Sequence, residues 1–256
     1  MKLDKNLTDS INYTQILFTD LGRLLILIIL DIIPIVNLIV LGYVSRVIKE
    51  HPDSKELPPL ENYWDLWVQG LKIVVAVIIY MIIPIILIVP FVFLAVLTWI
   101  AVPVLPIVSW LVAIPLLIIG LLLAFFLAII LAMAIVNMVR KDSFGKAFAF
   151  GEILSVIGKI GWGTYILWLL VLFICSLIVA GLGSIPAIGW ILSLLISPIF
   201  GVFIARSASL TYLEGVSPEA PKAVEAPKET TKKFCVYCGA EMTAKAIYCP
   251  KCGKKK

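Results

Sequence analysis

The central part of this sequence lacks charge altogether. From Ile73 to Val139, 67 consecutive residues include no Asp, Glu, Lys, Arg or His. A charged side chain at the centre of an inserted helix costs about 2.5 to 3.5 kcal/mol. A stretch of this length without one excludes the core of an ordinary soluble domain and indicates lipid surroundings.

Charge is also scarce in the chain as a whole. Charged residues make up 14% of the 256 residues and hydrophobic residues 62%, with a mean hydropathy of +1.10. Soluble domains are nearer one quarter charged and one half apolar. The composition therefore predicts an all-α integral membrane bundle. The net charge of +5 does not indicate nucleic-acid binding, because most basic residues flank apolar blocks or lie in the tail.

Residues for common enzyme chemistry are missing as well. The only histidine is His51, which stands beside Pro52 in a polar stretch, and no HExxH, GxSxG or P-loop pattern occurs. Asp31 is the single acid inside an apolar region, with Asn37 nearby. These two residues are the candidates for a transport role, although Pro34 favours a hairpin tip or helix cap at Asp31. We expect a protein that is not an enzyme.

The first apolar region, Leu21–Val44, fits two arrangements. One is a single kinked span, which would place Asp31 and Asn37 near the middle of the membrane. The other is a hairpin of two helices, about Gln15–Leu30 and Pro34–Lys49. Each arm would then measure about 24 Å, short of the roughly 30 Å hydrocarbon core unless tilt or bilayer thinning helps. The sequence leaves this choice open.

The other two apolar regions predict hairpins. The central block divides into helices at about Leu71–Thr98 and Trp110–Val139, because Pro103 and Pro106 break the helix between them. Charge disappears again from Ile160 to Ala205. Two further helices are expected there, Trp162–Ala180 and Trp190–Ala205, joined by a glycine-rich loop. With the first region as a hairpin, the bundle has six transmembrane helices in three hairpins.

Aromatic residues mark two expected interfacial helices. Between Leu60 and Leu71, apolar side chains recur with helical spacing and polar ones occupy the opposite face. A second such segment ends near Lys159, with Phe144, Phe148, Gly151 and Leu154 on one face. The expected anchors at headgroup depth are Tyr63, Trp64, Trp67, Phe144 and Phe148.

The distribution of basic residues predicts the orientation. The turns at about 31–34, 99–109 and 181–189 contain no lysine or arginine, whereas the other connections and the tail are basic. The positive-inside rule places the basic side in the cytoplasm. We therefore expect a multi-pass protein of the cytoplasmic membrane with a cytoplasmic C-terminus. It has six helices with both termini inside, or five with the N-terminus outside if Leu21–Val44 is one span.

Three segments together resemble a known family: IPIVNLIVLGYVSRVIK, LPPLENYWDLWVQGLK and VRKDSFGKAFAFGEIL. The chain is similar over roughly residues 5–213 to a prokaryotic, largely archaeal, multi-pass membrane family known only as a domain of unknown function. Gly42-Tyr43 with Arg46, Gly70-Leu71-Lys72, and Ala147-Phe148 with Gly151-Glu152 carry the resemblance. It implies a shared fold and no reaction.

The C-terminus contains two CxxC-Gly knuckles with ten residues between them, formed by Cys235, Cys238, Cys249 and Cys252. Four thiolates in tetrahedral arrangement make a closed structural zinc site, and Gly239 and Gly253 permit the positive φ of each turn. Two disulfides fit poorly with a cytoplasmic tail, and iron sites with similar knuckles use a longer spacer. We expect Zn²⁺ to supply most of the folding free energy of this module.

These features predict a membrane domain at 1–213, a flexible linker at 214–233 and a cytosolic zinc ribbon at 234–256. The expected partners are the lipid bilayer and a cytosolic protein bound by the ribbon. Nucleic acid is the weaker reading of the lysine-rich tail, and no oligomeric state can be predicted. The function that we expect is a membrane scaffold or membrane-organising protein. The alternative is a small-solute or lipid transporter or channel, with the ribbon as a regulatory tail.

Overall fold

The computed structural model describes residues 3–101, 106–216, 233–234, 238, 241–242 and 251–254. The chain divides into two compact units, Met1–Val216 and Ser217–Lys256. The first unit is helical. Its elements are α1 (Leu3–Gln15), η1 (Ile16–Phe18), α2 (Leu21–Ile32), α3 (Leu38–Lys49), α4 (Tyr63–Ala101), α5 (Pro106–Arg140), η2 (Phe144–Phe148), α6 (Phe150–Ile160), α7 (Trp162–Gly183) and α8 (Gly189–Val216). In the second unit, β1 (Lys233–Phe234) pairs antiparallel with β2 (Glu241–Met242).

Four helices in the described part of the chain are long and apolar enough to cross a membrane. They lie at Tyr63–Pro90, Leu117–Arg140, Trp162–Gly183 and Gly189–Val216. The apolar residues on their outer faces are exposed rather than packed in a core, as expected for helices surrounded by lipid. The chain is therefore a helical membrane protein, as its composition predicts.

The first apolar region forms two helices, so the single kinked span is wrong. Residues 33–37 form a turn between α2 and α3, where Ile35 adopts a positive φ of 73°. Each helix has 12 residues and measures about 18 Å. That length is well below the roughly 30 Å of the hydrocarbon core. The expected hairpin is present, but its arms are shorter than predicted and neither counts among the candidate spans.

The first interfacial helix does not exist as a separate element. Tyr63, Trp64 and Trp67 lie in the first turns of α4, which continues without a break into the apolar segment. A helix does not have to end where its side chains change from amphipathic to apolar. Asn62, with φ of 54°, precedes the helix, and its carbonyl accepts the amide of Leu66.

The second interfacial segment does form a short separate helix, α6, preceded by η2. Its packed face differs from the prediction, since Ile153, Val156, Ile157 and Ile160 are buried. Leu154 is exposed, while Phe144 and Phe148 are partly buried and pack edge to face. Thus α6 has apolar side chains both toward the bundle and away from it.

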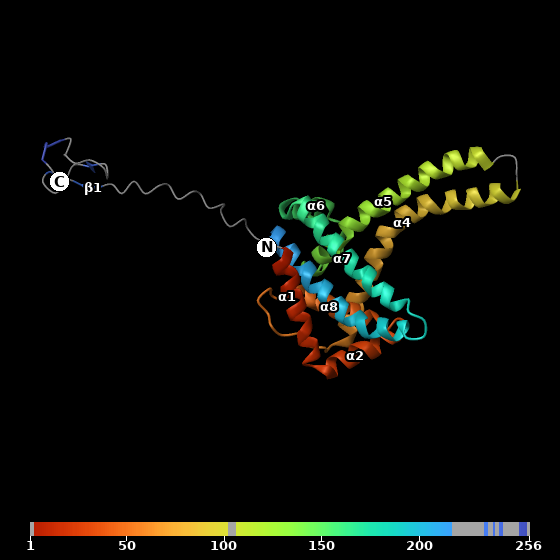
Figure 1. Cartoon of the computed structure of the whole chain (residues 1–256), viewed down its shortest axis with the longest axis horizontal. Helices are drawn as coiled ribbons and strands as arrows, with labels where there is room; N and C mark the ends of the chain where they lie inside the picture. Colours follow the sequence, from red (N-terminus) through yellow and green to blue (C-terminus); the bar gives the residue numbers. More distant parts are fainter. Residues whose placement is uncertain are drawn as a thin grey trace. The chain divides into compact units, whose positions relative to one another are not determined.

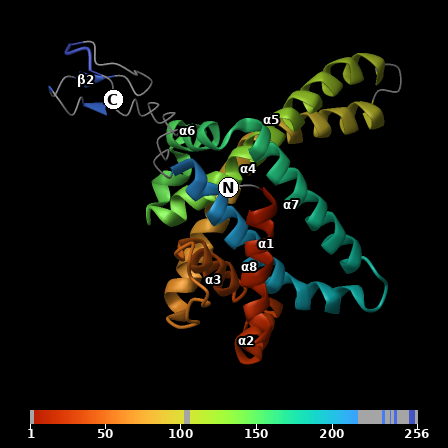
Figure 2. The same cartoon turned by 60° about the vertical axis from the view of Figure 1, so that its left-hand side comes forward.

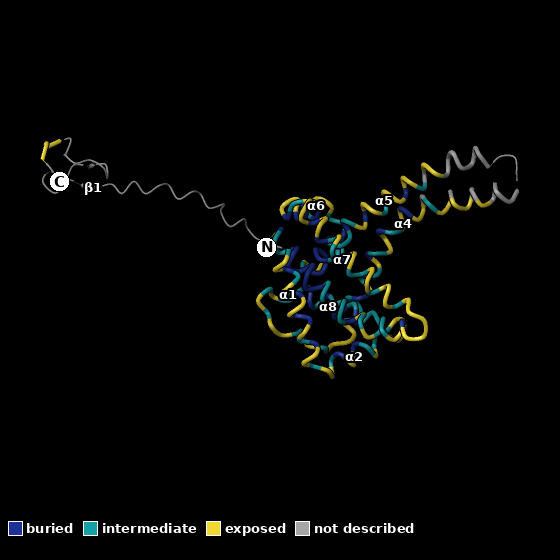
Figure 3. Tube along the Cα trace, in the orientation of Figure 1, coloured by how far each residue is buried: buried dark blue, intermediate teal, exposed yellow. Residues whose placement is uncertain are grey.

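The long helices form two hairpins. The ends of α4 and α5 nearest residues 102–105 lie on the same side of the first unit as the turn between α7 and α8, whereas α1 and α6 lie on the other side (Figure 1). Figure 2 shows the two hairpins diverging from their common base. Buried residues gather at this base, while the outer parts of the hairpins are largely exposed (Figure 3).

Two glycines set the distance between α3 and α4. A Cβ atom on Gly42 would lie 1.8 Å from the carbonyl oxygen of Leu66, and one on Gly70 would lie 1.9 Å from that of Leu38. The two contacts are reciprocal, so the antiparallel backbones touch at two points one turn apart. Such close approach between helices in membranes requires residues without a side chain. It gives a structural reason for glycine at two of the positions that carry the family resemblance.

Candidate functional site: an arginine-clamped loop

The most irregular part of the first unit is the connection between α3 and α4, residues 50–62, which we call the clamped loop. It contains Pro52, Pro58 and Pro59, and no helix or strand satisfies its backbone groups internally. Buried backbone groups need partners, so the source of those partners decides how the loop is held. Most of them come from side chains on other helices.

All four arginines of the chain donate to backbone carbonyls of this loop. Arg23 binds the carbonyls of Leu57 (3.1 Å) and Pro58 (2.9 Å), Arg46 binds Pro59 (2.9 Å), Arg140 binds Glu50 (3.1 Å), and Arg206 binds His51 (3.1 Å) and Pro52. A guanidinium carries five donors in a fixed planar arrangement, so one side chain can hold two successive carbonyls. Helices α2, α3, α5 and α8 each contribute one arginine.

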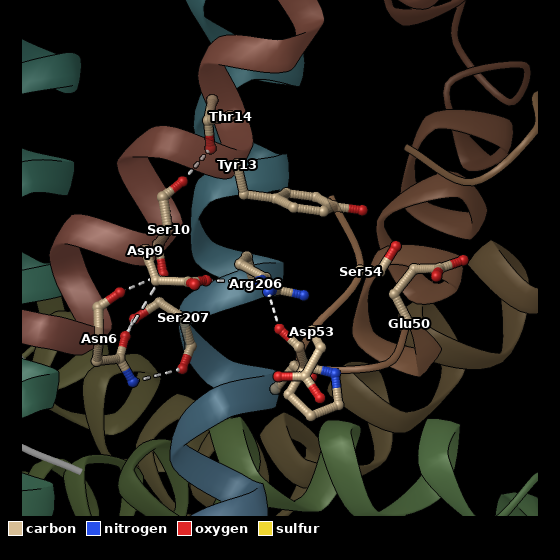
Figure 4. A network of polar contacts seen from close by, with 12 residues as sticks. Asn6, Asp9, Ser10, Tyr13, Thr14, Glu50, Asp53, Ser54, Arg206 and Ser207 are labelled. Carbon is tan, nitrogen blue, oxygen red and sulfur yellow. Dashed lines mark hydrogen bonds and ion pairs between the residues drawn. The ribbon is translucent and has the colours of Figure 1, made fainter. Parts of the chain in front are cut away.

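Arg206 is the most deeply placed of the four. Its residue is 2% exposed, and its Nε donates to Asp9 Oδ1 at 2.8 Å. The guanidinium also lies over the ring of Tyr13, with Cζ 4.5 Å from the ring centroid, and Tyr13 in turn donates to the carbonyl of Glu56 (3.1 Å). Figure 4 shows the Arg206 side chain between α1 and the loop. Arg206 thus joins α1, α8 and the clamped loop.

A polar seam continues from this ion pair along α1. Asn6, Ser10 and Thr14 recur every four residues and are buried against α8, an unusual inward face for polar side chains. Asn6 donates through Nδ2 to Thr211 Oγ1 (2.9 Å). Its Oδ1 accepts from Ser207 Oγ (2.7 Å), and these two residues are seen side by side in Figure 4. Ser207 also accepts from the indole of Trp168 on α7 (2.8 Å). Because every member has partners, the seam can stay buried at little cost.

A second cluster connects the end of α5 with α8. Asn137 donates to the carbonyl of Lys146 (2.8 Å) and accepts from the hydroxyl of Tyr212 (2.7 Å). Arg140 also donates to Ser209, whose own hydroxyl donates to the carbonyl of Ile48 (3.0 Å). Helices α1, α3, α5 and α7 therefore all form hydrogen bonds with the polar final third of α8.

Ion pairs at the edge of the base are exposed. Glu152 of α6 accepts from Lys141 (2.6 Å) and Lys146, and hydrogen bonds from these lysines, chiefly Lys141, lower the pKa of Glu152 to about 2. Lys49 pairs with Asp142 in the same way. Exposed pairs such as these contribute little to stability, so the buried seam is the stronger support.

The clamped loop presents side chains to solvent while its carbonyls face the bundle. The side chains of His51 and Asp53 are 74% and 90% exposed, which agrees with the expectation of an exposed histidine at position 51. Tyr13 lies beneath the loop, where burial raises the pKa of its hydroxyl well above the usual value. A rigid loop with solvent-facing polar side chains is typical of a recognition surface.

Asp31 and Asn37, the candidates for a transport role, lie outside this site. Asp31 occupies the last turn of α2 and Asn37 is the N-terminal cap residue of α3, and both are partly buried. The structure thus places Asp31 at a hairpin tip, the role favoured by the sequence.

Of the expected anchors, Trp64 is 73% exposed and stacks on Trp67, whose indole donates to the carbonyl of Ile35 (3.0 Å). Their depth in a membrane stays a prediction.

Two of the expected zinc ligands, Cys235 and Cys249, lie outside the described residues. Strands β1 and β2 flank the first knuckle, with Phe234 opposite Glu241. Gly253 adopts a φ of 68°, the left-handed conformation expected after the second knuckle. Among described residues, no group of three or more metal-binding side chains occurs. The zinc site stays a prediction.

Sequence reasoning did not single out Asp9, Arg206 or the seam. A signal was present, because Asn6, Ser10 and Thr14 match the helical spacing of Ser207 and Thr211 in α8. Two polar stripes of equal period can pair face to face. The two segments stand about 200 residues apart, and many other pairings were possible.

A comparison with protein-family models matches residues 25–188 to a family described as "Protein of unknown function (DUF4013)". The chain belongs to this family. The matched range of the DUF4013 family includes the clamped loop together with Arg46 and Arg140, and it begins two residues after Arg23. It ends before Arg206 and begins after Asp9, so the family model does not cover that ion pair. No curated protein and no solved structure matches the chain.

Proposed function

We propose that this chain is a non-enzymatic integral membrane scaffold that presents a cytosolic surface and recruits a cytosolic protein through a C-terminal zinc ribbon. The observation that supports the proposal is the use of all four arginines to hold one loop of the chain's own backbone. Their donors shape a surface instead of binding a substrate. The two knuckles add a closed metal site on a separate unit, and closed sites are structural.

The proposal is tested by cross-linking in intact cells followed by purification of the full-length chain. We expect proteins that cross-link to the wild type to be lost from the double variant Cys238→Ser/Cys252→Ser. The matched control is Cys175→Ser, which removes a cysteine of α7 and should retain the same proteins. Equal recovery with the double variant and the control would contradict recruitment by the ribbon.

The zinc site itself makes a quantitative prediction. Purified full-length protein should contain about one zinc per chain by elemental analysis, since four thiolates fill a tetrahedral site. Removal of zinc with a chelator should make the four tail thiols reactive toward a thiol reagent and leave the helical circular dichroism unchanged. Four titratable thiols before chelation, without metal, would refute the site.

The orientation can be tested separately. In our proposal, all basic connections of the first unit lie on the cytoplasmic face of the membrane. The hairpin α2–α3 returns to the face from which it starts, so it does not change this orientation whether or not it spans. An impermeant amine reagent should therefore label Lys55 and Lys146 only in inside-out vesicles. Labelling of the two lysines from opposite faces would contradict the topology.

One observation favours the alternative, a transporter or channel. The short helices α2 and α3 carry Asp31 and Asn37 beside their turn, and short paired helices with polar ends often form transport sites. Under this alternative, reconstituted protein should conduct a small solute across vesicles, and Asp31→Asn should abolish the flux. Absence of flux across a panel of ions and small solutes would leave the scaffold as the better proposal.

A further inference from the structure

The hairpin α2–α3 begins and ends at the same face of the first unit. At the start of α2, Arg23 is joined to the clamped loop through Leu57 and Pro58. At the end of α3, Glu50 leads directly into that loop and its carbonyl accepts from Arg140. Both helices are therefore fixed at one base, from which they extend only about 18 Å.

One face of α2 consists of exposed apolar side chains. Leu27 is fully buried on the inner face and Leu24 nearly so. The outer face and the turn expose large apolar residues: Leu21, Leu25, Ile26, Ile29, Ile32, Ile33 and Ile35. An exposed apolar surface of this extent marks contact with lipid or another apolar partner. Because α2 packs against α8, a helix long and apolar enough to span a membrane, lipid is the partner that fits.

The turn at residues 33–37 is suited to apolar surroundings. The carbonyls of Ile33, Val36 and Asn37 accept backbone amides, and that of Ile35 accepts both the amide of Leu38 and the indole of Trp67. Pro34 has no amide to satisfy. Irregular backbone tolerates the hydrocarbon region only when its polar groups are paired within the protein.

The same turn recurs between α7 and α8, which provides a measure of depth. In each, a positive φ follows proline, 73° at Ile35 and 70° at Ala187, and a tryptophan indole donates to that residue's carbonyl. The carbonyl before each proline accepts the amide four residues later, 3.0 Å for Ile33 and 2.8 Å for Ile185. Helix α7 has 22 residues and can span, whereas α2 has 12. Helix α2 is therefore 10 residues, or about 15 Å, shorter than α7.

We propose that α2–α3 is a re-entrant hairpin that enters the bilayer beside the clamped loop, turns within the near leaflet, and contacts acyl chains of that leaflet only. The hairpin adds volume to that leaflet alone, which gives a physical basis for organising the membrane around this protein. The proposal does not depend on the ribbon or on its partner. Asp31, in the last turn of α2, is half-buried near the turn between the two helices.

The depth of equivalent residues tests the proposal. Ile33 and Ile185 both precede the proline of their turn and are 49% and 40% exposed, so each can be replaced by a fluorescent amino acid. Full-length variants are reconstituted into phosphatidylcholine vesicles with nitroxide lipids labelled either near the glycerol or near the chain end. We expect the ratio of chain-end quenching to shallow quenching to be several-fold higher at position 33 than at position 185.

A graded series on α2 provides a second readout. Probes at Leu21, Leu25 and Ile33 should show progressively deeper quenching, and external iodide should not reach position 33. Equal shallow quenching along the series would mean that α2 lies in the interface and would overturn the proposal. Shallow quenching at position 33 alone, matching position 185, would mean that the hairpin spans and would overturn it equally. Thermal midpoints equal to the wild type confirm that each variant folds.

Discussion

Arg206→Ala should lower the free energy of unfolding by about 2 to 4 kcal/mol, because it removes a buried guanidinium that serves three acceptors. The substitution leaves the half-exposed Asp9 without its ion-pair partner, removes the donor to the carbonyl of Pro52, and leaves the carbonyl of His51 with the amide of Ser54 alone. It also removes the group that packs on the ring of Tyr13. The midpoint of thermal unfolding in detergent should fall by several degrees, and the clamped loop should become sensitive to protease.

Two matched variants separate the causes of this effect. Arg206→Lys keeps the charge but cannot direct donors to three acceptors, so it should recover only part of the lost stability. Arg46→Ala removes a guanidinium that makes one exposed contact to the same loop, with Pro59, and should cost less than about 1 kcal/mol. An equal loss for Arg46→Ala and Arg206→Ala would show that burial of Arg206 has no special importance.

Gly70→Ala should be strongly destabilising, although it adds only one methyl group. The new Cβ would lie 1.9 Å from the carbonyl oxygen of Leu38, an atom of a helix backbone that cannot turn aside. Helices α3 and α4 must separate, and overpacking of this kind costs about 3 kcal/mol or more. The higher helix propensity of alanine offsets about 1 kcal/mol of that cost. Gly42→Ala should behave alike, because its Cβ would meet Leu66 at 1.8 Å.

Other helical glycines provide the control. Gly158 in α6 and Gly181 in α7 have no atom within 4 Å of an added Cβ. Alanine at either position should leave the thermal midpoint unchanged or raise it slightly, because it gains helix propensity without a clash. Thermal unfolding followed by circular dichroism compares the four variants directly. Loss of stability at Gly158 equal to that at Gly70 would contradict the close-packing explanation.

Some features of the candidate site could be predicted and others could not. The exposure of His51 followed from its polar, proline-containing surroundings. The interfacial helix predicted between Leu60 and Leu71 was wrong as a separate element, because amphipathic spacing shows which faces of a helix differ and does not show where the helix ends. The prediction of the packed face of α6 was also wrong. Both faces of this helix carry apolar residues, so the elements packed against it decide which face is buried.

The sequence alone determined the class of the protein, because 67 residues without charge are incompatible with an aqueous setting. Proline and glycine also marked the turn between α7 and α8 locally. Only the tertiary structure decided that the arginines serve one loop, that α1 buries its polar stripe, and that Gly42 and Gly70 join two helices. Those contacts pair residues far apart in the chain, and a local pattern such as the polar stripe of α1 does not specify which distant segment it packs against.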